Sequence, residues 1–349
     1  MRLLPIDSKI LALALTLAAS SICAQDQKSL NERCIDGIIC PIERYYPPKD
    51  TSMILTKNLK VDLDELVTQG DFLITTNGFD LTIKFRSRIE INGTLTIRSF
   101  TSSDRPTPPK PAEDGLDSNV KFNSGPNTDG HTPCDFCPSK ASDCFACPGS
   151  PGGTGGPGTS GDPGVHGKSG GQVILEFRDD PGFKASGSVH FLLRGQSGGK
   201  GGAGGNGGRG GAGEQGGKGY PSGTGGCSQE AQRGGNGGDG GDAGKGGPGG
   251  NAGNGGTAFV LYIPKSGNLK FLDHDVSPGE PGEGGDPGKP GEPGERGLGG
   301  QGFKGCDAAP PEKTGLRGKI GEPSNPETLK KMKGKSGQPG QPGSVKPIP

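Results

Sequence analysis

Residues 195–219 read GQSGGKGGAGGNGGRGGAGEQGGKG, and glycine returns in one phase every third residue. Similar blocks cover residues 149–170, 235–256 and 279–300, with shorter echoes at 315–321 and 334–343. A three-residue period matches the polyproline II helix, which has three residues per turn and a rise of about 3.1 Å per residue. Glycine leaves one or more edges of such a helix bare, so that backbones can approach closely. We therefore predict extended helices packed side by side.

The blocks differ in the number of bare edges. Blocks 195–219 and 235–256 are mostly Gly-Gly-X, which suits a polyglycine II bundle joined by backbone amides and weak Cα–H contacts. Block 279–300 is mostly Gly-X-Pro, so one edge is bare and the pattern is collagen-like, with a possible homotrimer as its consequence. In the Gly-Gly-X blocks the X side chains point outward. The candidate contact residues are Lys200, Asn206, Arg209, Asn236 and Asp239.

A flexible glycine-rich linker is the alternative for all of these blocks. Ordering a backbone costs roughly 1–2 kcal/mol per residue, and glycine loses the most freedom. The unbroken register favours order, because a flexible linker has no need of it.

The composition limits the functional class. Glycine (72) and proline (32) together make about 30% of the 349 residues, a share typical of low-complexity or collagen-like chains. Only 28% of residues are hydrophobic and tryptophan is absent, which argues against an enzyme with one large core. Because 38 basic residues balance 38 acidic ones, no net field attracts nucleic acid or an anionic membrane.

The N-terminus predicts export. Arg2 and Lys9 precede an apolar run at residues 10–19, and Ala24 is the best cleavage position. We predict a secretory signal peptide over residues 1–24 and no membrane span. The expected location is extracellular or at the cell surface, or periplasmic if the protein is retained.

Eight cysteines remain after this cleavage, and an even number outside the cytosol favours disulfides. Local spacing suggests a Cys34–Cys40 bond and pairing within the cluster 134–147, which leaves Cys227 with Cys306. The cluster, CxxC-x6-CxxC, also has the ligands of a four-cysteine zinc site, although its spacer is short. We predict disulfides, no metal and no cofactor, with zinc and a redox site as alternatives. The cluster residues are Cys134, Cys137, Cys144 and Cys147.

The chain divides by composition into six regions. Residues 25–57 form an irregular N-terminal segment, and residues 58–100 a β region with alternating apolar residues and turns at Asn77-Gly78 and Asn92-Gly93. Residues 101–148 are predicted to be a polar loop that contains the cysteine cluster. Residues 149–305 hold the triplet blocks with β-strand pairs between them, and residues 306–349 a tail with one short helix beginning near Pro326.

The strand pairs suggest an architecture. Runs 81–85 with 95–100, 173–177 with 189–193 and 259–263 with 269–272 each read as strand, turn, strand. The fold class is therefore all-β with little helix, built as a small β-solenoid or as separate hairpins that carry long triplet excursions. Stacked rungs would place residues 173–177 next to residues 259–263 and hold the triplet blocks side by side.

In its triplet blocks the chain resembles secreted bacterial collagen-like and glycine-rich surface proteins. The Gly-Gly-X blocks are also similar to the polyglycine II bundles of phage tail-fibre tip adhesins and of small glycine-rich antifreeze proteins. This resemblance covers roughly residues 149–302 and is one of composition. It implies an extracellular structural or adhesive role.

We therefore predict a secreted or cell-surface protein with no enzymatic activity, since no nucleophile–base set is visible. Its partner is an unknown extracellular ligand or matrix component. The first alternative is an adhesin that displays loops to a carbohydrate or receptor on the bundle. The second is an exported metal or redox protein that uses the CxxC cluster.

Overall fold

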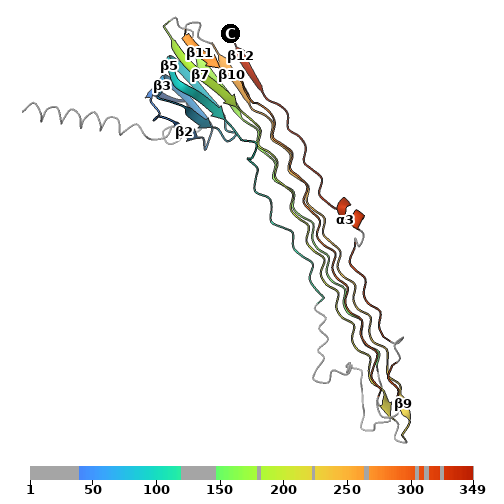
Figure 1. The fold of residues 1–349 in the computed structure, drawn as a ribbon. Helices are drawn as coiled ribbons and strands as arrows, with labels where there is room; N and C mark the ends of the chain where they lie inside the picture. Colours follow the sequence, from blue (N-terminus) through green and yellow to red (C-terminus); the bar gives the residue numbers. More distant parts are fainter. Residues whose placement is uncertain are drawn as a thin grey trace, which may run out of the picture.

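The computed structural model describes residues 39–118, 147–178, 182–221, 225–262, 267–302, 306–309, 314–322 and 326–348. The predicted signal peptide and Cys34, Cys134, Cys137 and Cys144 lie outside these residues. The described chain forms a β head and a long rod of extended segments that leaves the head on one side (Figure 1).

The head is a ten-stranded sheet in which every strand pairing is parallel. One row of strands follows the order β1-β3-β5-β6-β10-β12, and the other joins β2, β4, β5, β7 and β11. The long strand β5 takes part in both rows. The strands are β1 (Ile39–Tyr45), β2 (Thr51–Ile54), β3 (Leu59–Thr68), β4 (Phe72–Thr75), β5 (Leu81–Arg98), β6 (Gln172–Phe177), β7 (Lys184–Leu192), β10 (Thr257–Leu261), β11 (Gly267–Phe271) and β12 (Ser344–Ile348).

The all-β prediction is confirmed, and the described residues contain one short helix, α3 (Pro326–Lys331), where the tail was predicted to hold one. The predicted neighbours are also confirmed, because β6 pairs with β10 through Val173–Ala258 and Leu175–Val260. The strand pairs are not hairpins: β6 and β7 each pair with β5 instead of with each other.

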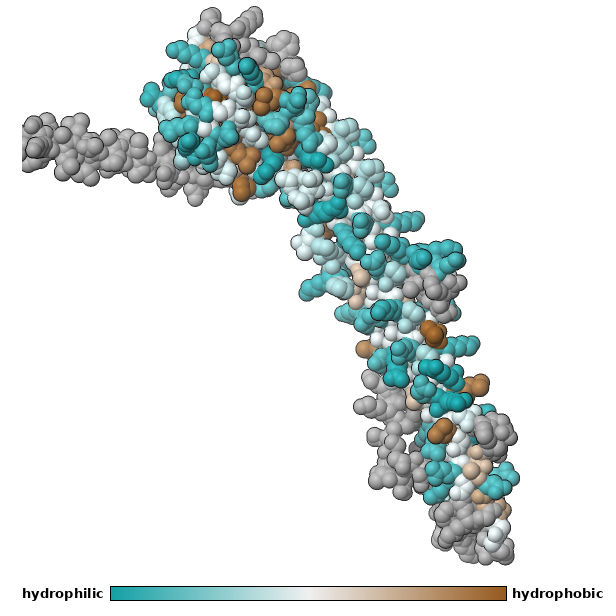
Figure 2. Space-filling view, in the orientation of Figure 1, coloured by the Kyte–Doolittle hydropathy of each residue, from teal (hydrophilic) through white to brown (hydrophobic). Residues whose placement is uncertain are grey.

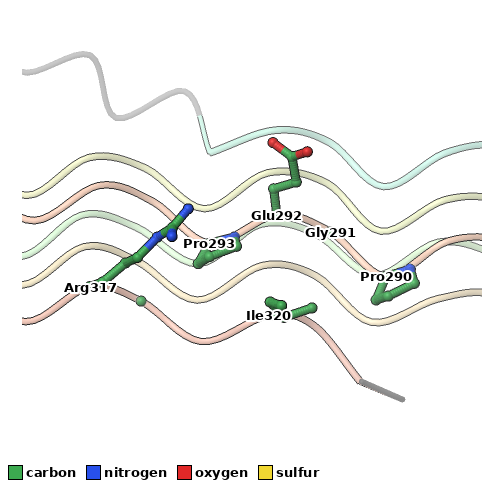
Figure 3. Close-up of a pocket in the computed structure, with 7 residues that line it drawn as sticks. Pro290, Gly291, Glu292, Pro293, Arg317 and Ile320 are labelled. Carbon is green, nitrogen blue, oxygen red and sulfur yellow. The ribbon is translucent and has the colours of Figure 1, made fainter. Parts of the chain in front are cut away.

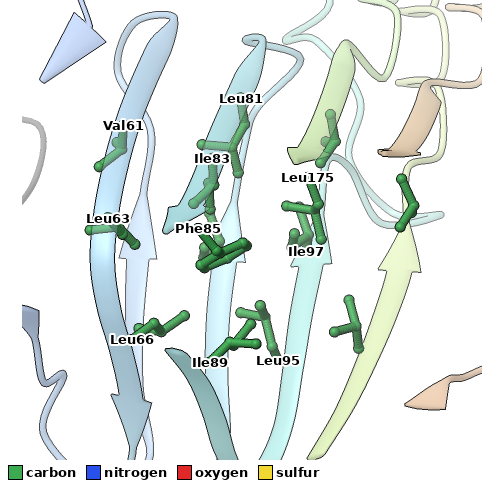
Figure 4. Close-up of a cluster of buried hydrophobic side chains, with 14 of the residues drawn as sticks. Val61, Leu63, Leu66, Leu81, Ile83, Phe85, Ile89, Leu95, Ile97 and Leu175 are labelled. Atoms are coloured by element: carbon green, nitrogen blue, oxygen red, sulfur yellow. The ribbon is translucent and has the colours of Figure 1, made fainter. Parts of the chain in front are cut away.

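The core lies between the buried faces of the two rows (Figure 4). Alternate residues of each strand point inward. Parallel pairing therefore places the inward apolar residues of neighbouring strands directly against one another. Val61, Ile83 and Leu175 form one such ladder, and Phe85 stacks on Phe177 with ring centroids 5.2 Å apart. The head supplies the apolar burial that the glycine-rich blocks lack.

The two predicted turns have different outcomes. Asn77-Gly78 is a turn with both residues at positive φ (51° and 81°). The prediction for Asn92-Gly93 is wrong, because this pair lies inside β5. There the pairing of β5 with β7 shifts between Glu90 and Thr94, and Gly93 takes a φ of 146°. A Cβ at Gly93 would meet the backbone of Gly70 and Asp71, so glycine permits a break in register within a continuous strand.

The described part of the rod consists of six extended segments that run alternately away from and back to the head (Figure 1). We number them PP1 (104–118), PP2 (147–170), PP3 (195–219), PP4 (232–256), PP5 (277–302) and PP6 (314–322 with 332–343). Each is hydrogen-bonded to the segments one and two places away in this order. The result is two layers of parallel segments, PP1-PP3-PP5 and PP2-PP4-PP6, packed antiparallel to each other. A 25-residue segment is roughly 80 Å long at about 3.1 Å per residue.

The segment PP1 differs from the structure predicted for these residues from the sequence. Residues 101–133 were predicted to be part of a loop, yet Ala112, Gly115 and Ser118 donate their N–H groups to the carbonyls of Ala203, Asn206 and Arg209. This segment has little triplet glycine, which hid it. As an outer segment it needs a bare edge at fewer positions.

Candidate functional site: the faces and edges of the rod

Each triplet of an inner segment has three distinct positions, which PP3 illustrates. Gly207 donates its N–H to the carbonyl of Lys289 in PP5, and Gly208 donates to Gly156 in PP2, both at 2.8 Å. The third residue, Arg209, is exposed. We call these the a, b and x positions: a bonds to the segment two places ahead, b to the segment one place back, and x faces solvent.

Glycine occupies the a and b positions because neighbouring backbones leave no space for a side chain. A Cβ added to Gly207 would lie within 3.0 Å of the Gly241 carbonyl, and one added to Gly208 within 3.0 Å of the Leu116 carbonyl. The same holds at most a and b positions of PP3 and PP4, which have neighbours on both sides. The exceptions are alanine at the a positions 243 and 252 and larger residues at the b positions 196, 214 and 232, near the ends of the segments. The Gly-Gly-X pattern is therefore the signature of an inner segment.

The collagen-like pattern of PP5 has a different cause from the predicted one. Its glycines are b positions, and Gly288 and Gly291 donate to the carbonyls of Gly244 and Gly241 in PP4. Its prolines stand at a positions, where the described residues place no further segment to accept a hydrogen bond. Proline has no N–H, so it leaves no unpaired donor on this edge. A triple helix would need the same glycine edge, so the two arrangements are mutually exclusive. The a-position prolines are Pro278, Pro281, Pro287, Pro290 and Pro293.

The five predicted contact residues are all exposed, and four of them use their side chains within the rod. Lys200 forms an ion pair with Asp286 at 3.0 Å. Asn206, Asn236 and Asp239 accept the N–H groups of Lys289, Leu316 and Lys319 on their Oδ1 atoms. The guanidinium of Arg209 has no partner among the described residues.

These side-chain bonds extend into ladders across each layer. In one layer, Asp114 Oδ1 accepts the N–H of Asn206, and Asn206 Oδ1 accepts the N–H of Lys289. In the other, His166 Nδ1 accepts the N–H of Asn251, and Asn251 Oδ1 accepts the N–H of Gln338. In these ladders the N–H of an x residue has no backbone acceptor in the neighbouring segment of its layer. The x side chain of that segment supplies the acceptor instead. This role was not predicted from the sequence, although Asn and Asp recur at the x positions.

Ion pairs add charge contacts on the rod surface. Asp286 contacts both Lys200 and, at 3.5 Å, Lys333, so one carboxylate links PP3, PP5 and PP6. The hydrogen bond from Lys200, then its positive charge, lowers the pKa of Asp286, and the same contact raises the pKa of Lys200. Such exposed pairs stabilise a fold only weakly.

PP5 and PP6 border an open groove of about 580 Å³ on the edge of the rod (Figure 3). Pro290, Pro293 and Ile320 give it an apolar floor, and Glu292 and Arg317 line its sides. Arg317 is paired with Glu295 at 3.3 Å. The groove is where a seventh segment would continue the zigzag order, and the prolines remove the donors that such a segment would need.

PP6 is interrupted by α3, and the interruption has a defined length. Before it, the x residues of PP4 bond residues 80 positions later, as Asp242 does with Glu322. After it the separation is 87, as for Asn251 with Gln338. Seven extra residues therefore leave the bundle here. The ladder from PP4 continues without a gap, because Ala243 donates to Glu322 and Gly246 donates to Met332.

The end of the rod farthest from the head carries a small antiparallel ribbon, β8 (Tyr220–Pro221) with β9 (Cys227–Gln229). The predicted Cys227–Cys306 disulfide is present beside it and joins residues 79 positions apart. Cys40 and Cys147 are disulfide-bonded as well.

The visible surface of the rod is mostly hydrophilic with scattered apolar residues (Figure 2). None of the helices in the described chain is long and apolar enough to cross a membrane. Among the described residues, no group of three or more His, Cys, Asp or Glu side chains is placed to hold a metal ion.

No protein-family model matches the chain, and no curated protein matches it. Among solved structures, the chain has a weak similarity to an antifreeze protein from the springtail Granisotoma rainieri, described as a nine polyproline type II helical bundle. The two sequences are 23% identical over 51% of this chain and 96% of the other, with a TM-score of 0.06. A TM-score this low carries no information on the fold or function of this chain.

Proposed function

We propose that this protein is a non-enzymatic structural or adhesive protein of the cell exterior, in which the β head holds a stiff rod away from its base. This proposal rests on the arrangement of the rod. Backbone hydrogen bonds join its interior, so the exposed x side chains are displayed on a fixed lattice of positions.

The position of the first and last described strands supports this orientation. The first and last described strands, β1 and β12, are both in the head, whereas the β8–β9 ribbon lies at the opposite end of the rod (Figure 1). Attachment through the head would leave the tip free to reach a partner. The second candidate, an adhesin that presents loops to a carbohydrate or receptor, is favoured by the disulfide that closes this tip.

An epitope inserted between Pro221 and Gly225 tests the proposed location. On intact producing cells, or in their medium, the epitope should be recognised by antibody without lysis. Mild proteolysis without a reducing agent should cleave this epitope no faster than an epitope placed in the head. Recognition only after lysis would contradict the proposal. A glycan array with and without residues 220–229 then separates the two candidates, because only the second requires the tip.

A further inference from the structure

The α3 interruption changes the local charge of the rod. The whole chain is neutral, with 38 basic and 38 acidic residues. Within and after α3, however, four of the six residues 330–335 are lysines, and all four are exposed. The sequence signal is a basic run of the kind found in polyanion-binding patches. These lysines are Lys330, Lys331, Lys333 and Lys335.

Further lysines lie close to this run. Lys245 in PP4 directly precedes Gly246, which donates to the Met332 carbonyl, and one triplet later Gly249 donates to the Lys335 carbonyl. On the other side, Lys200 and Lys333 share a single acidic partner, Asp286. Lys330, Lys331, Lys335 and Lys245 make no ion pair with any described residue. The acids closest to the run are Asp286, which pairs with Lys333, Glu327 in the first turn of α3, and Asp242 and Glu322, one triplet before the interruption.

The bundle does not need the inserted part of this basic run, which holds Lys330 and Lys331, for its own packing. The PP4 ladder is unbroken across the interruption, so the seven extra residues close no hydrogen-bond gap. Lys330 and Lys331 end the helix that leaves the lattice, whereas Lys333 and Lys335 stand at the start of the second part of PP6. All four side chains are exposed, so they can contact something outside the rod.

The side chains of these lysines and their surroundings indicate which class of polyanion they bind. Lysine offers a hydrated point charge that binds sulfate, carboxylate or phosphate without a fixed geometry. The described residues of segments PP1–PP6 contain no Phe, Tyr or Trp, so these segments lack the aromatic stacking that holds single-stranded nucleic acid. The helix α3 lies on the outer side of the rod (Figure 1), where a flexible linear chain can reach it.

We propose that Lys330, Lys331, Lys333 and Lys335, with Lys245, bind a linear polysaccharide that carries sulfate or carboxylate groups. This inference rests on the proposed exterior role and names the partner class for it. Binding is electrostatic, so it weakens as salt rises.

The test uses the full-length exported protein and immobilised heparin as the probe, with uncharged dextran as the blank. One variant changes the four run lysines to glutamine (Lys330→Gln, Lys331→Gln, Lys333→Gln, Lys335→Gln). The matched control changes four exposed or half-buried lysines elsewhere (Lys57→Gln, Lys60→Gln, Lys110→Gln, Lys184→Gln), so both variants lose the same charge. We expect the first variant to bind heparin at least about tenfold more weakly, with a shallower salt dependence, and the control to bind within about twofold of the parent.

Three results would overturn the inference: no heparin binding by the parent, an equal loss in both variants, or equally tight binding of a DNA duplex that depends on the same lysines. The melting temperature of each variant is measured alongside. If the epitope experiment succeeds and heparin binding fails, only this inference falls. If the epitope is found inside the cell, the proposed exterior role is wrong, whether or not the protein binds heparin.

Discussion

Interior glycines are required by the distance between neighbouring backbones. Gly208 and Arg209 are adjacent in PP3, but a Cβ at Gly208 would contact the Leu116 carbonyl, while Arg209 already carries an exposed side chain. The two residues therefore form a matched pair for mutation.

We predict that Gly208→Ala destabilises the rod by about 1–3 kcal/mol, the usual cost of forcing extra atoms into a packed site. Arg209→Ala should change stability by less than about 0.5 kcal/mol, as expected for a surface position. Thermal unfolding followed by circular dichroism in the polyproline II region measures both. Equal melting temperatures would show that the segments do not pack as closely as described.

The x-position side chains have a role that a conservative substitution can isolate. Asp239 Oδ1 accepts the N–H of Lys319 at 2.7 Å. We predict that Asp239→Ala speeds amide hydrogen exchange at Lys319 and lowers stability by about 0.5–1.5 kcal/mol. Asp239→Asn keeps the acceptor oxygen and should leave exchange at Lys319 nearly unchanged. If both variants behave alike, the charge matters and the hydrogen bond does not.

At the scale of the element, the outer edge of PP5 depends on proline. We predict that Pro290→Gly with Pro293→Gly bares a backbone edge with two new donors and promotes side-by-side association of rods. Light scattering across a concentration series should then show species larger than those of the parent. Pro248→Gly, at an x position of PP4, removes a proline without opening an edge and serves as the control. Unchanged mass for the edge variant would contradict this protective role.

The α3 interruption predicts which deletions the rod tolerates. Because the interruption adds seven residues to the register, a variant that lacks residues 324–330 should join the two parts of PP6 in phase. Its melting temperature should stay within a few degrees of the parent. A variant that lacks residues 324–331 shifts every following glycine out of the b position and should melt well below it. Similar behaviour of both deletions would refute the fixed register.

Much of the structure at the level of strands and segments can be predicted from the sequence, and the rest depends on contacts between neighbouring segments. The triplet phase and the alternation of residues 59–63 and 81–85 are local properties, so the segments and the β head were predictable. The position of a segment within the bundle is not local. PP1 was missed because an outer segment needs few glycines, and PP5 was interpreted as collagen because an edge proline and a triple-helix proline occupy the same triplet position. The hydrogen-bond ladders through Asn206 and Asn251 become visible only when the offsets between segments are known.

At the scale of the whole molecule, the tip is closed by the Cys227–Cys306 disulfide. In the chain-entropy model, a loop of this length is worth about 4 kcal/mol. We predict that Cys227→Ser with Cys306→Ser lowers the melting temperature and frays the rod from the tip inward. Hydrogen exchange should rise first near Gly219 and last near Gly195. Uniform exchange along PP3 would place the weak point elsewhere.

The same disulfide makes a prediction for the parent protein. Thiol labelling of freshly purified exported protein should find no free thiol, and Cys227 and Cys306 should be recovered in one linked peptide. Two or more labelled cysteines in the native protein would contradict this expectation.

The out-and-back path of the chain also determines how the molecule bears force. A pull on the tip against the head loads all the segments side by side, and the hydrogen bonds that join them lie across the direction of the pull. To lengthen the rod, neighbouring segments would have to slide, and bonds along the whole overlap would break together. A flexible glycine-rich chain of the same composition would stretch like a spring. This rod would instead transmit tension with little extension, as a strut or tether does.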